Sequence, residues 1–171
     1  MKGSLYNRSY ANRGAQLERL VDMTNRQYQT KGIADIRKVP TPVQITKHNG
    51  RTVTGYTKKG EWVDYVGVYD GRSIVFDAKE TRETTRFPLA NITHHQFLLL
   101  ESWYQKGAKS FLIISYTKRN EIYLLPFKQL QEAWEGYVGD GRKSIPYEEF
   151  LMNCDLITSD KGYVLHYLKH V

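Results

Sequence analysis

Little cysteine and no long apolar run occur in this sequence. Cys154 is the one cysteine among 171 residues, which excludes an intrachain disulfide framework and any multi-cysteine zinc site. The longest strictly apolar runs are four residues, whereas a membrane-spanning helix needs roughly 18. The first residues also lack the apolar stretch of a signal peptide. We therefore expect a cytoplasmic protein with no membrane partner.

Two widespread catalytic motifs are missing as well. No Gly-x-x-x-x-Gly-Lys-Ser/Thr loop is present to cradle phosphates, because the glycines and Ser144 within 139–144 have the wrong spacing. No Gly-x-Ser-x-Gly turn presents a nucleophilic serine. ATP-driven motor activity and esterase chemistry are therefore unsupported.

Positive charge is plentiful and concentrated near the N-terminus. The net charge is +7; residues 1–60 carry +9, and residues 61–101 carry −3. A basic segment can replace the counterions condensed on a polyphosphate. An acidic segment repels phosphate unless a divalent cation lies between them. This distribution favours nucleic acid as the partner over an anionic membrane or a basic surface that only aids solubility.

Hydrophobic residues make up 40% of the chain, enough for a core, and their spacing predicts an α/β fold with a mixed sheet flanked by helices. The expected elements are a helix over 12–30, a strand over 33–39 that 43–45 could continue, strands over 62–69 and 73–79, a helix from Asn91 or Thr93 to about 106, strands over 110–116 and 121–125, helices over 126–135 and 146–153, and a last strand over 162–171. Residues 46–60 hold three glycines and four cations, which predicts an exposed hairpin or protruding loop.

Two aspartates are placed symmetrically about a strong turn signal. Asp70-Gly71 predicts a tight turn that pairs its flanking strands antiparallel, with Asp64 opposite Asp77. Lys79 lies two residues after Asp77 and therefore projects to the same face. Close carboxylates repel unless one is protonated or a cation bridges them, and Mg²⁺ is a hard cation suited to oxygen ligands. Spacing alone leaves open a second reading, a salt-bridge cluster on an exposed strand face.

The basic loop has the composition of a DNA probe. Arg51, Lys58 and Lys59 can neutralise phosphates, and Tyr56 can stack on an unpaired base. An ordinary exposed hairpin is the alternative interpretation.

The spacing Asp64-(twelve residues)-Asp77-Ala78-Lys79 is similar to the PD-(D/E)-x-K nuclease signature. Its flanks carry further motifs: Asn12-Arg13-Gly14 with Glu18, Thr24-Asn25-x-x-Tyr28, Gly32-Ile33-Ala34, Pro40-Thr41-Pro42-Val43-Gln44-Ile45, Asp64-Tyr65-x-Gly67-Val68-Tyr69, Ala78-Lys79-Glu80-Thr81, Phe87-Pro88-Leu89, His95-Gln96 and Tyr123-Leu124-Leu125-Pro126. Together, over residues 12–126, these motifs resemble the RecU family of Holliday junction resolvases.

The resemblance implies a restriction-endonuclease-like core, with residues 12–171 as one nuclease domain, a stalk at about 46–60 and a flexible basic arm over 1–11. It also implies a homodimer that cuts four-way DNA junctions symmetrically with Mg²⁺, for which Mn²⁺ is a substitute. Contact with a recombinase is a further implied role.

The resemblance also assigns site residues. Asp64 and Asp77 would bind the metal together with the Ala78 carbonyl, and Lys79 would position or deprotonate the attacking water or stabilise the phosphorane. Glu18 and Gln96 fall at positions that the family brings to its active site. Both have other readings: Thr93-x-x-Gln96 fits a helix capping box, and an exposed helical glutamate needs no role.

The Asn12-Arg13-Gly14 motif makes Arg13 an expected DNA-binding residue. Val63 precedes Asp64 where the family usually has threonine, and the loop between Gln44 and Asp64 is shorter than the family's stalk. Two alternative functions therefore stay open. One is a nuclease acting on forks, flaps or a specific duplex sequence. The other is a non-catalytic DNA-binding module that modulates a recombinase.

Overall fold

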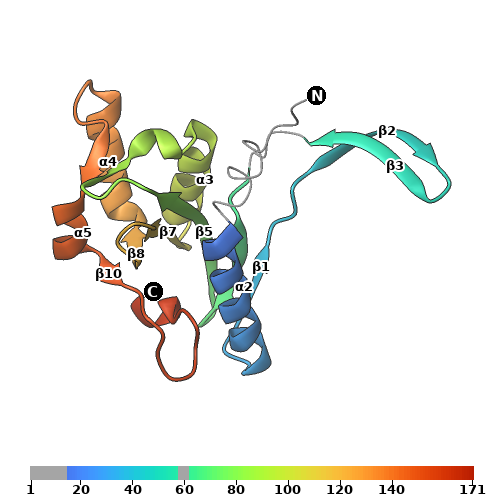
Figure 1. The fold of residues 1–171 in the computed structure, drawn as a ribbon, viewed down its shortest axis with the longest axis horizontal. Coiled ribbons are helices and arrows are strands. Elements are labelled where there is room, and N and C mark those ends of the chain that lie inside the picture. The colour runs from blue at the N-terminus through green and yellow to red at the C-terminus, as the bar shows by residue number, and fades with distance from the viewer. Residues whose placement is uncertain (1–14, 58–61) are drawn as a thin grey trace, which may run out of the picture.

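A mixed sheet lies at the centre of the computed structural model, which describes residues 15–57 and 62–171 (Figure 1). Within those residues the sheet has six strands in the order β1-β4-β5-β7-β8-β10. β5 and β7 run parallel, and the other neighbouring strands run antiparallel. The mixed α/β class expected from the sequence is confirmed.

The strands are β1 (Ala34–Lys38), β2 (Val43–Asn49), β3 (Thr52–Thr57), β4 (Tyr65–Tyr69), β5 (Arg72–Thr81), β6 (Arg86–Pro88), β7 (Lys109–Tyr116), β8 (Glu121–Pro126), β9 (Ser144–Pro146) and β10 (Asp155–Leu156). The helices are α2 (Ala15–Thr30), α3 (His94–Gln105), α4 (Phe127–Val138) and α5 (Tyr147–Asn153), with short 3₁₀ helices η1 (Leu89–Asn91) and η2 (Tyr167–His170).

The turn between β4 and β5 sets the register on which the site depends. Asp70 and Gly71 have φ of 49° and 70°, the left-handed pair that a two-residue hairpin turn needs. The ladder runs from this turn to Tyr65 opposite Phe76. The next residues outward are Asp64 and Asp77, so the expected pairing of the two aspartates is confirmed, although β4 begins at Tyr65 rather than at residue 62.

Two apolar clusters pack on opposite faces of the sheet. On one face, α2 and the C-terminal segment bury side chains such as Val21 and Tyr167 against β5 and β7. On the other, α3, α4 and α5 bury side chains such as Leu100 and Phe150. β7 is buried along almost its whole length, as its continuous apolar sequence predicts. No helix in the described part of the chain is long and apolar enough to cross a membrane.

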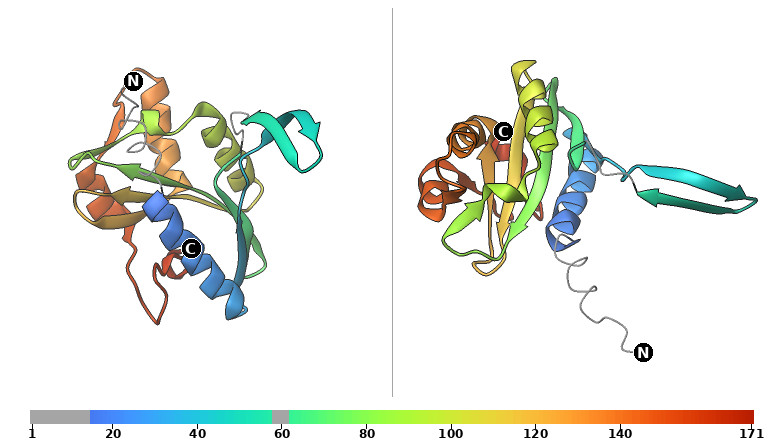
Figure 2. Two further views of the ribbon diagram at one scale, coloured as in Figure 1. Left: turned by 45° about the vertical axis from the view of Figure 1, so that its right-hand side comes forward. Right: turned by 90° about the horizontal axis from the view of Figure 1, so that it is seen from above.

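β2 and β3 form a separate two-stranded hairpin that projects from the body of the protein (Figure 2). Every residue of both strands is exposed, which agrees with a protruding element. The hairpin begins at Val43, three residues earlier than expected. The expectation that 43–45 extends β1 is wrong, because Pro40 and Pro42, which lack N–H donors, separate the strands.

The C-terminal segment does not form the predicted strand over 162–171. Its backbone bonds to side chains of α2 instead: Leu165 N–H donates to Thr24 Oγ1, and Val164 N–H donates to Gln27 Oε1, each at 3.0 Å. The segment then ends in η2, and the last strand of the sheet is β10, which pairs with β8.

Candidate active site

Asp64 and Asp77 hold each other through crossed hydrogen bonds. The Asp64 N–H donates to Asp77 Oδ1 at 3.0 Å, and the Ala78 N–H donates to Asp64 Oδ2 at 3.0 Å. The β4–β5 ladder ends at the Tyr65–Phe76 pair. The Ala78 N–H of β5 is therefore not used by the ladder and is available to the Asp64 carboxylate. Asp77 is fully buried, so the alternative of a salt-bridge cluster on an exposed strand face does not describe this pair.

Lys79 completes the group on the same face of β5. Its Nζ lies 2.6 Å from Asp77 Oδ2 and 3.2 Å from Gln96 Oε1. The Lys79 side chain is 19% exposed, so the ammonium lies at the boundary between this buried group and solvent. The structure therefore brings two carboxylates and one ammonium together, as the alternation along β5 predicts.

Gln96 fulfils both of the roles that the sequence left open. Its backbone N–H donates to Thr93 Oγ1 at 3.3 Å while its Oε1 accepts from the Thr93 N–H at 3.1 Å, a complete capping box at the start of α3. Its Nε2 also donates to Asp77 Oδ1 at 3.1 Å. The cap thus orients the amide, with the oxygen toward Lys79 and the nitrogen toward Asp77.

The surroundings of Asp64 and Asp77 disfavour the state in which both carboxyl groups are ionised. Burial, and then the neighbouring Asp77 carboxylate, raise the pKa of Asp64 from 3.8 to about 6. Two hydrogen-bonded carboxylates in a partly dry site disfavour a second negative charge. A bound cation would reverse this preference.

The donor set fits a hard divalent cation. Asp77 Oδ2 is buried and accepts no well-aligned hydrogen bond, although the Lys79 ammonium is close. The Ala78 carbonyl points to the same edge of β5 as the Ala78 N–H that reaches Asp64, because both groups of a strand residue face one side. The described residues contain no group of three or more His, Cys, Asp or Glu side chains that could hold a metal ion by themselves. Two carboxylates, water and substrate phosphate are the ligands that Mg²⁺ commonly takes.

Glu18 lies outside this hydrogen-bonded group. Its Oε2 is 2.5 Å from Lys38 Nζ, and both side chains are partly exposed. Lys38 is next to Val39, whose N–H donates to the Asp64 carbonyl at 2.8 Å. The Glu18–Lys38 pair is therefore adjacent to Asp64, and sequence reasoning missed Lys38 because only the register of β1 on β4 places it there.

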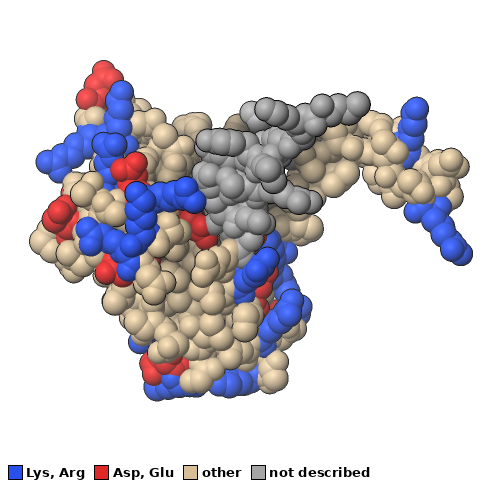
Figure 3. Space-filling model, in the orientation of Figure 1, with Lys and Arg blue, Asp and Glu red and all other residues tan. Residues whose placement is uncertain are grey.

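Of the expected DNA-binding residues, the structure describes Arg51 and Tyr56 and not the other three. Arg13, Lys58 and Lys59 lie outside the described residues, as does the expected arm over 1–11. Arg51 and Tyr56 are exposed on the β2–β3 hairpin. Figure 3 shows cationic side chains on the distal part of this hairpin, away from the body of the protein.

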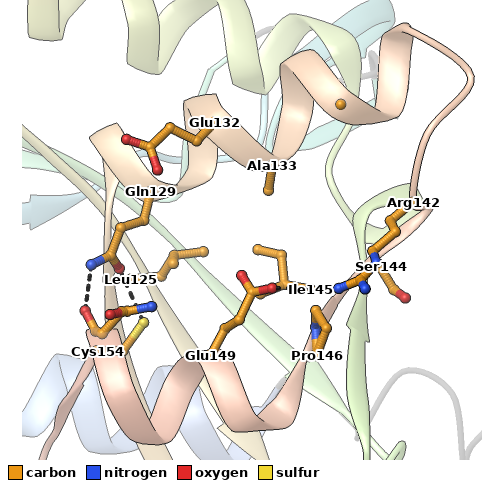
Figure 4. A pocket seen from close by; sticks show the side chains of 12 residues that line it. Leu125, Gln129, Glu132, Ala133, Arg142, Ser144, Ile145, Pro146, Glu149 and Cys154 are labelled. Atoms are coloured by element: carbon orange, nitrogen blue, oxygen red, sulfur yellow. Dashed lines mark hydrogen bonds and ion pairs between the residues drawn. The ribbon is translucent and has the colours of Figure 1, made fainter.

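A separate cavity of about 310 Å³ lies between α4, β9 and α5 (Figure 4). It is lined by apolar and charged side chains, including Glu132, Arg142 and Glu149, and by none of the predicted site residues. Burial raises the pKa of the Cys154 thiol there to about 12, so the thiol stays protonated and unreactive at neutral pH. This cavity is not the predicted active site.

The fold and the grouping of Asp64, Asp77 and Lys79 agree with the PD-(D/E)-x-K nuclease signature that the sequence resembles. Comparison with known proteins identifies the family. The family model RecU, Recombination protein U, matches residues 12–171. The chain belongs to the RecU family.

Curated relatives support this membership over most of the chain. A protein named Holliday junction resolvase RecU from Staphylococcus saprophyticus is 35% identical over 99% of this chain and 85% of its own length. One of the same name from Geobacillus sp. is 42% identical over 82% of this chain and 73% of its own length. A solved structure of Hjc, a Holliday junction resolvase from Archaeoglobus fulgidus, matches 67% of this chain and 73% of that chain at 13% identity and a TM-score of 0.39.

Proposed function

We propose that this protein is a structure-selective endonuclease that resolves four-way (Holliday) DNA junctions by Mg²⁺-dependent phosphodiester hydrolysis during recombination and repair. The observation that carries the proposal is the crossed Asp64–Asp77 pair with Lys79 beside it. Membership of the RecU family and the names of the relatives supply the substrate. Mn²⁺ is expected to replace Mg²⁺, because both accept oxygen ligands.

Asp64, Asp77 and the Ala78 carbonyl would hold the metal, which when bound relieves phosphate charge and activates water. Lys79 holds its ammonium next to this position, where it can orient the attacking water or stabilise charge that develops on the phosphorane. Gln96 restrains Lys79 and Asp77 at once, so the cap of α3 keeps the ammonium and the carboxylate in register.

Glu18 is assigned a supporting role at the edge of the site. Its ion pair with Lys38 lies adjacent to Asp64. The pair adds one positive and one negative charge where a DNA strand would enter.

Cleavage of a four-way junction requires two cuts on opposing strands. A homodimer places one site on each of two strands, because a two-fold dimer matches the two-fold symmetry of the junction. The β2–β3 hairpin is the element that reaches furthest from the body (Figure 2), and Arg51 and Tyr56 on it would contact the branch point together with Lys58 and Lys59. Arg13 would contact an arm. Contact with a recombinase stays a prediction from the family.

The test is a cleavage assay on a synthetic immobile four-way junction, a replication fork, a flap and a linear duplex at equal protein concentration, with Mg²⁺ or EDTA. The proposal predicts symmetric cuts in the four-way junction when Mg²⁺ is present and no cuts in EDTA. Asp77→Asn should abolish cleavage while leaving junction binding largely intact. The matched control Asp160→Asn removes a partly exposed carboxylate on the other side of the sheet and should cleave as the unaltered protein does.

Other outcomes would assign a different function. Preferential cutting of forks, flaps or duplex would make the protein a nuclease of another substrate. Absence of Mg²⁺-dependent cutting, with binding that depends on Lys58 and Lys59, would make it a non-catalytic DNA-binding module.

A further inference from the structure

A basic cleft lies at the C-terminal end of α3, whereas the carboxylate pair lies at its N-terminal end. Its volume is about 450 Å³. One wall comes from the β4–β5 turn and the start of β5, including Arg72 and Ser73, and the other comes from the end of α3 and the residues that follow it, including Ser102, Trp103 and Lys106. The lining residues include two cations and no carboxylate. Small hydroxyl side chains next to cations are typical contacts for phosphate oxygens.

Hydrogen bonds occupy the last carbonyls of α3 next to the cleft, and the Lys106 ammonium lies at this negative end of the helix. The carbonyls of Ser102, Trp103 and Tyr104 each accept a hydrogen bond, from Lys106 or the two residues that follow it. Lys106 Nζ also bonds Ser102 Oγ at 2.8 Å, which fixes the ammonium at the cleft and leaves one of its three N–H groups free. Asp70 and Glu101 are the neighbouring carboxylates along the chain, and neither is part of the cleft lining.

α3 connects this cleft directly to the active site. Gln96 in its first turn bonds Asp77, and Lys106 follows ten residues later. At 1.5 Å per residue the two ends are about 15 Å apart. This distance corresponds to about four base pairs, since phosphates of one DNA strand recur every 3.4 Å along the duplex axis.

The surface between the two ends is open to a duplex. α3 packs on one face of the sheet and does not cover β4 and β1 on that face. Val68 of β4 is 53% exposed there, and the side chains of Asp35 and Arg37 of β1 are each 60% exposed. Asp35 and Arg37 form an ion pair of 2.5 Å, which offsets the one carboxylate on that face of β1. Trp62, half-exposed just before Val63 and Asp64, packs edge-on against Trp103.

We propose that Arg72 and Lys106 form a second DNA-contact site, which binds the phosphate backbone of the substrate duplex about four base pairs from the cleaved bond. The proposal rests on the proposed function, because the duplex is the arm that the active site cuts. The site would add affinity without reading sequence, because backbone contacts carry no base information.

The test measures junction binding by fluorescence anisotropy in EDTA, over a range of salt concentrations. The variant Arg72→Gln with Lys106→Gln keeps polar stems and removes two charges. The matched control, Lys161→Gln with Lys169→Gln, removes two charges from the C-terminal segment, which packs against α2 on the opposite face. Arg72→Lys with Lys106→Arg keeps both charges. Circular dichroism and thermal unfolding check that each variant folds.

Loss of two phosphate contacts should reduce the slope of log affinity against log salt by about 1.8, which corresponds to about 60-fold weaker binding at 0.1 M salt if the affinities match at 1 M salt. The control and the charge-keeping variant should retain the original slope. An unchanged slope in the Gln variant, or an equal loss in the control, would overturn the cleft as a specific contact and leave the proposed function standing. Failure of the unaltered protein to bind any junction would overturn both.

Discussion

Neutralising Asp64 should stabilise the metal-free protein. Burial and the Asp77 carboxylate raise the pKa of Asp64 from 3.8 to about 6. At about 1.4 kcal/mol for each pH unit by which a pKa moves, ionising Asp64 in the folded protein costs about 3 kcal/mol. In Asp64→Asn the amide oxygen still accepts from the Ala78 N–H, and the amide nitrogen can donate to Asp77. The substitution therefore removes the unfavourable charge and keeps the hydrogen bonds.

The sign of the pH dependence follows from the raised pKa. Between about pH 4 and pH 6 the folded protein keeps a proton on Asp64 that the unfolded chain has lost. The free energy of unfolding therefore decreases as the pH rises through this window and is level above it. The variant lacks this decrease, so its advantage should be absent below pH 4 and reach its full size at pH 7 to 8.

Urea unfolding in EDTA at pH 4, 5, 6, 7 and 8 measures this difference. Asp160→Asn serves as the control, because its carboxylate is partly exposed and its distance to the Lys169 ammonium is 3.4 Å. Mg²⁺ should raise the stability of the unaltered protein at pH 8 and have little effect on the variant. A variant that is less stable than the unaltered protein at pH 8, or a difference that does not depend on pH, would refute this reasoning.

Other substitutions test the surroundings of the site. Thr93→Ala should lower stability by about 1 kcal/mol through loss of the α3 cap and slow single-turnover junction cleavage, because Gln96 is no longer held; Thr93→Ser should restore both, and an unchanged cleavage rate in Thr93→Ala would show that the cap does not position Gln96. Lys38→Gln breaks an exposed ion pair and should change the free energy of unfolding by less than about 1 kcal/mol, whereas it should weaken junction binding; unaltered binding would separate the Glu18–Lys38 pair from the DNA surface. Tyr28→Phe removes the hydroxyl that accepts from the Leu168 N–H at 3.2 Å and should cost about 1–3 kcal/mol in urea unfolding, and no loss would mean that the C-terminal segment is not anchored on α2 by this bond.

The geometry of the carboxylate pair follows from local sequence. A two-residue turn fixes the register of the residues on either side of it, and Asp64 and Asp77 are symmetric about Asp70-Gly71. The alternation of a strand then places Lys79 beside Asp77. The cap of α3 is likewise encoded in four consecutive residues, Thr93 to Gln96.

Features that depend on distant parts of the chain were not predictable in this way. The segment over 162–171 has the composition of a strand, but Thr24 and Gln27 on α2 satisfy its backbone from more than 130 residues away. Lys38 reaches the site only because β1 pairs with β4 in one register. The cleft of Arg72 and Lys106 requires the end of α3 to meet the β4–β5 turn, and no spacing in the sequence indicates that contact.

The most direct test of the central claim is to locate the metal. Crystals of the protein soaked in Mn²⁺ should show an anomalous difference peak for an ion between Asp64 and Asp77. One carboxylate oxygen of each aspartate and the Ala78 carbonyl should bind this ion. The same soak of Asp77→Asn should show no peak there. A peak at another place, or an unoccupied carboxylate pair at saturating Mn²⁺, would contradict the assignment of these residues as the metal site of a nuclease.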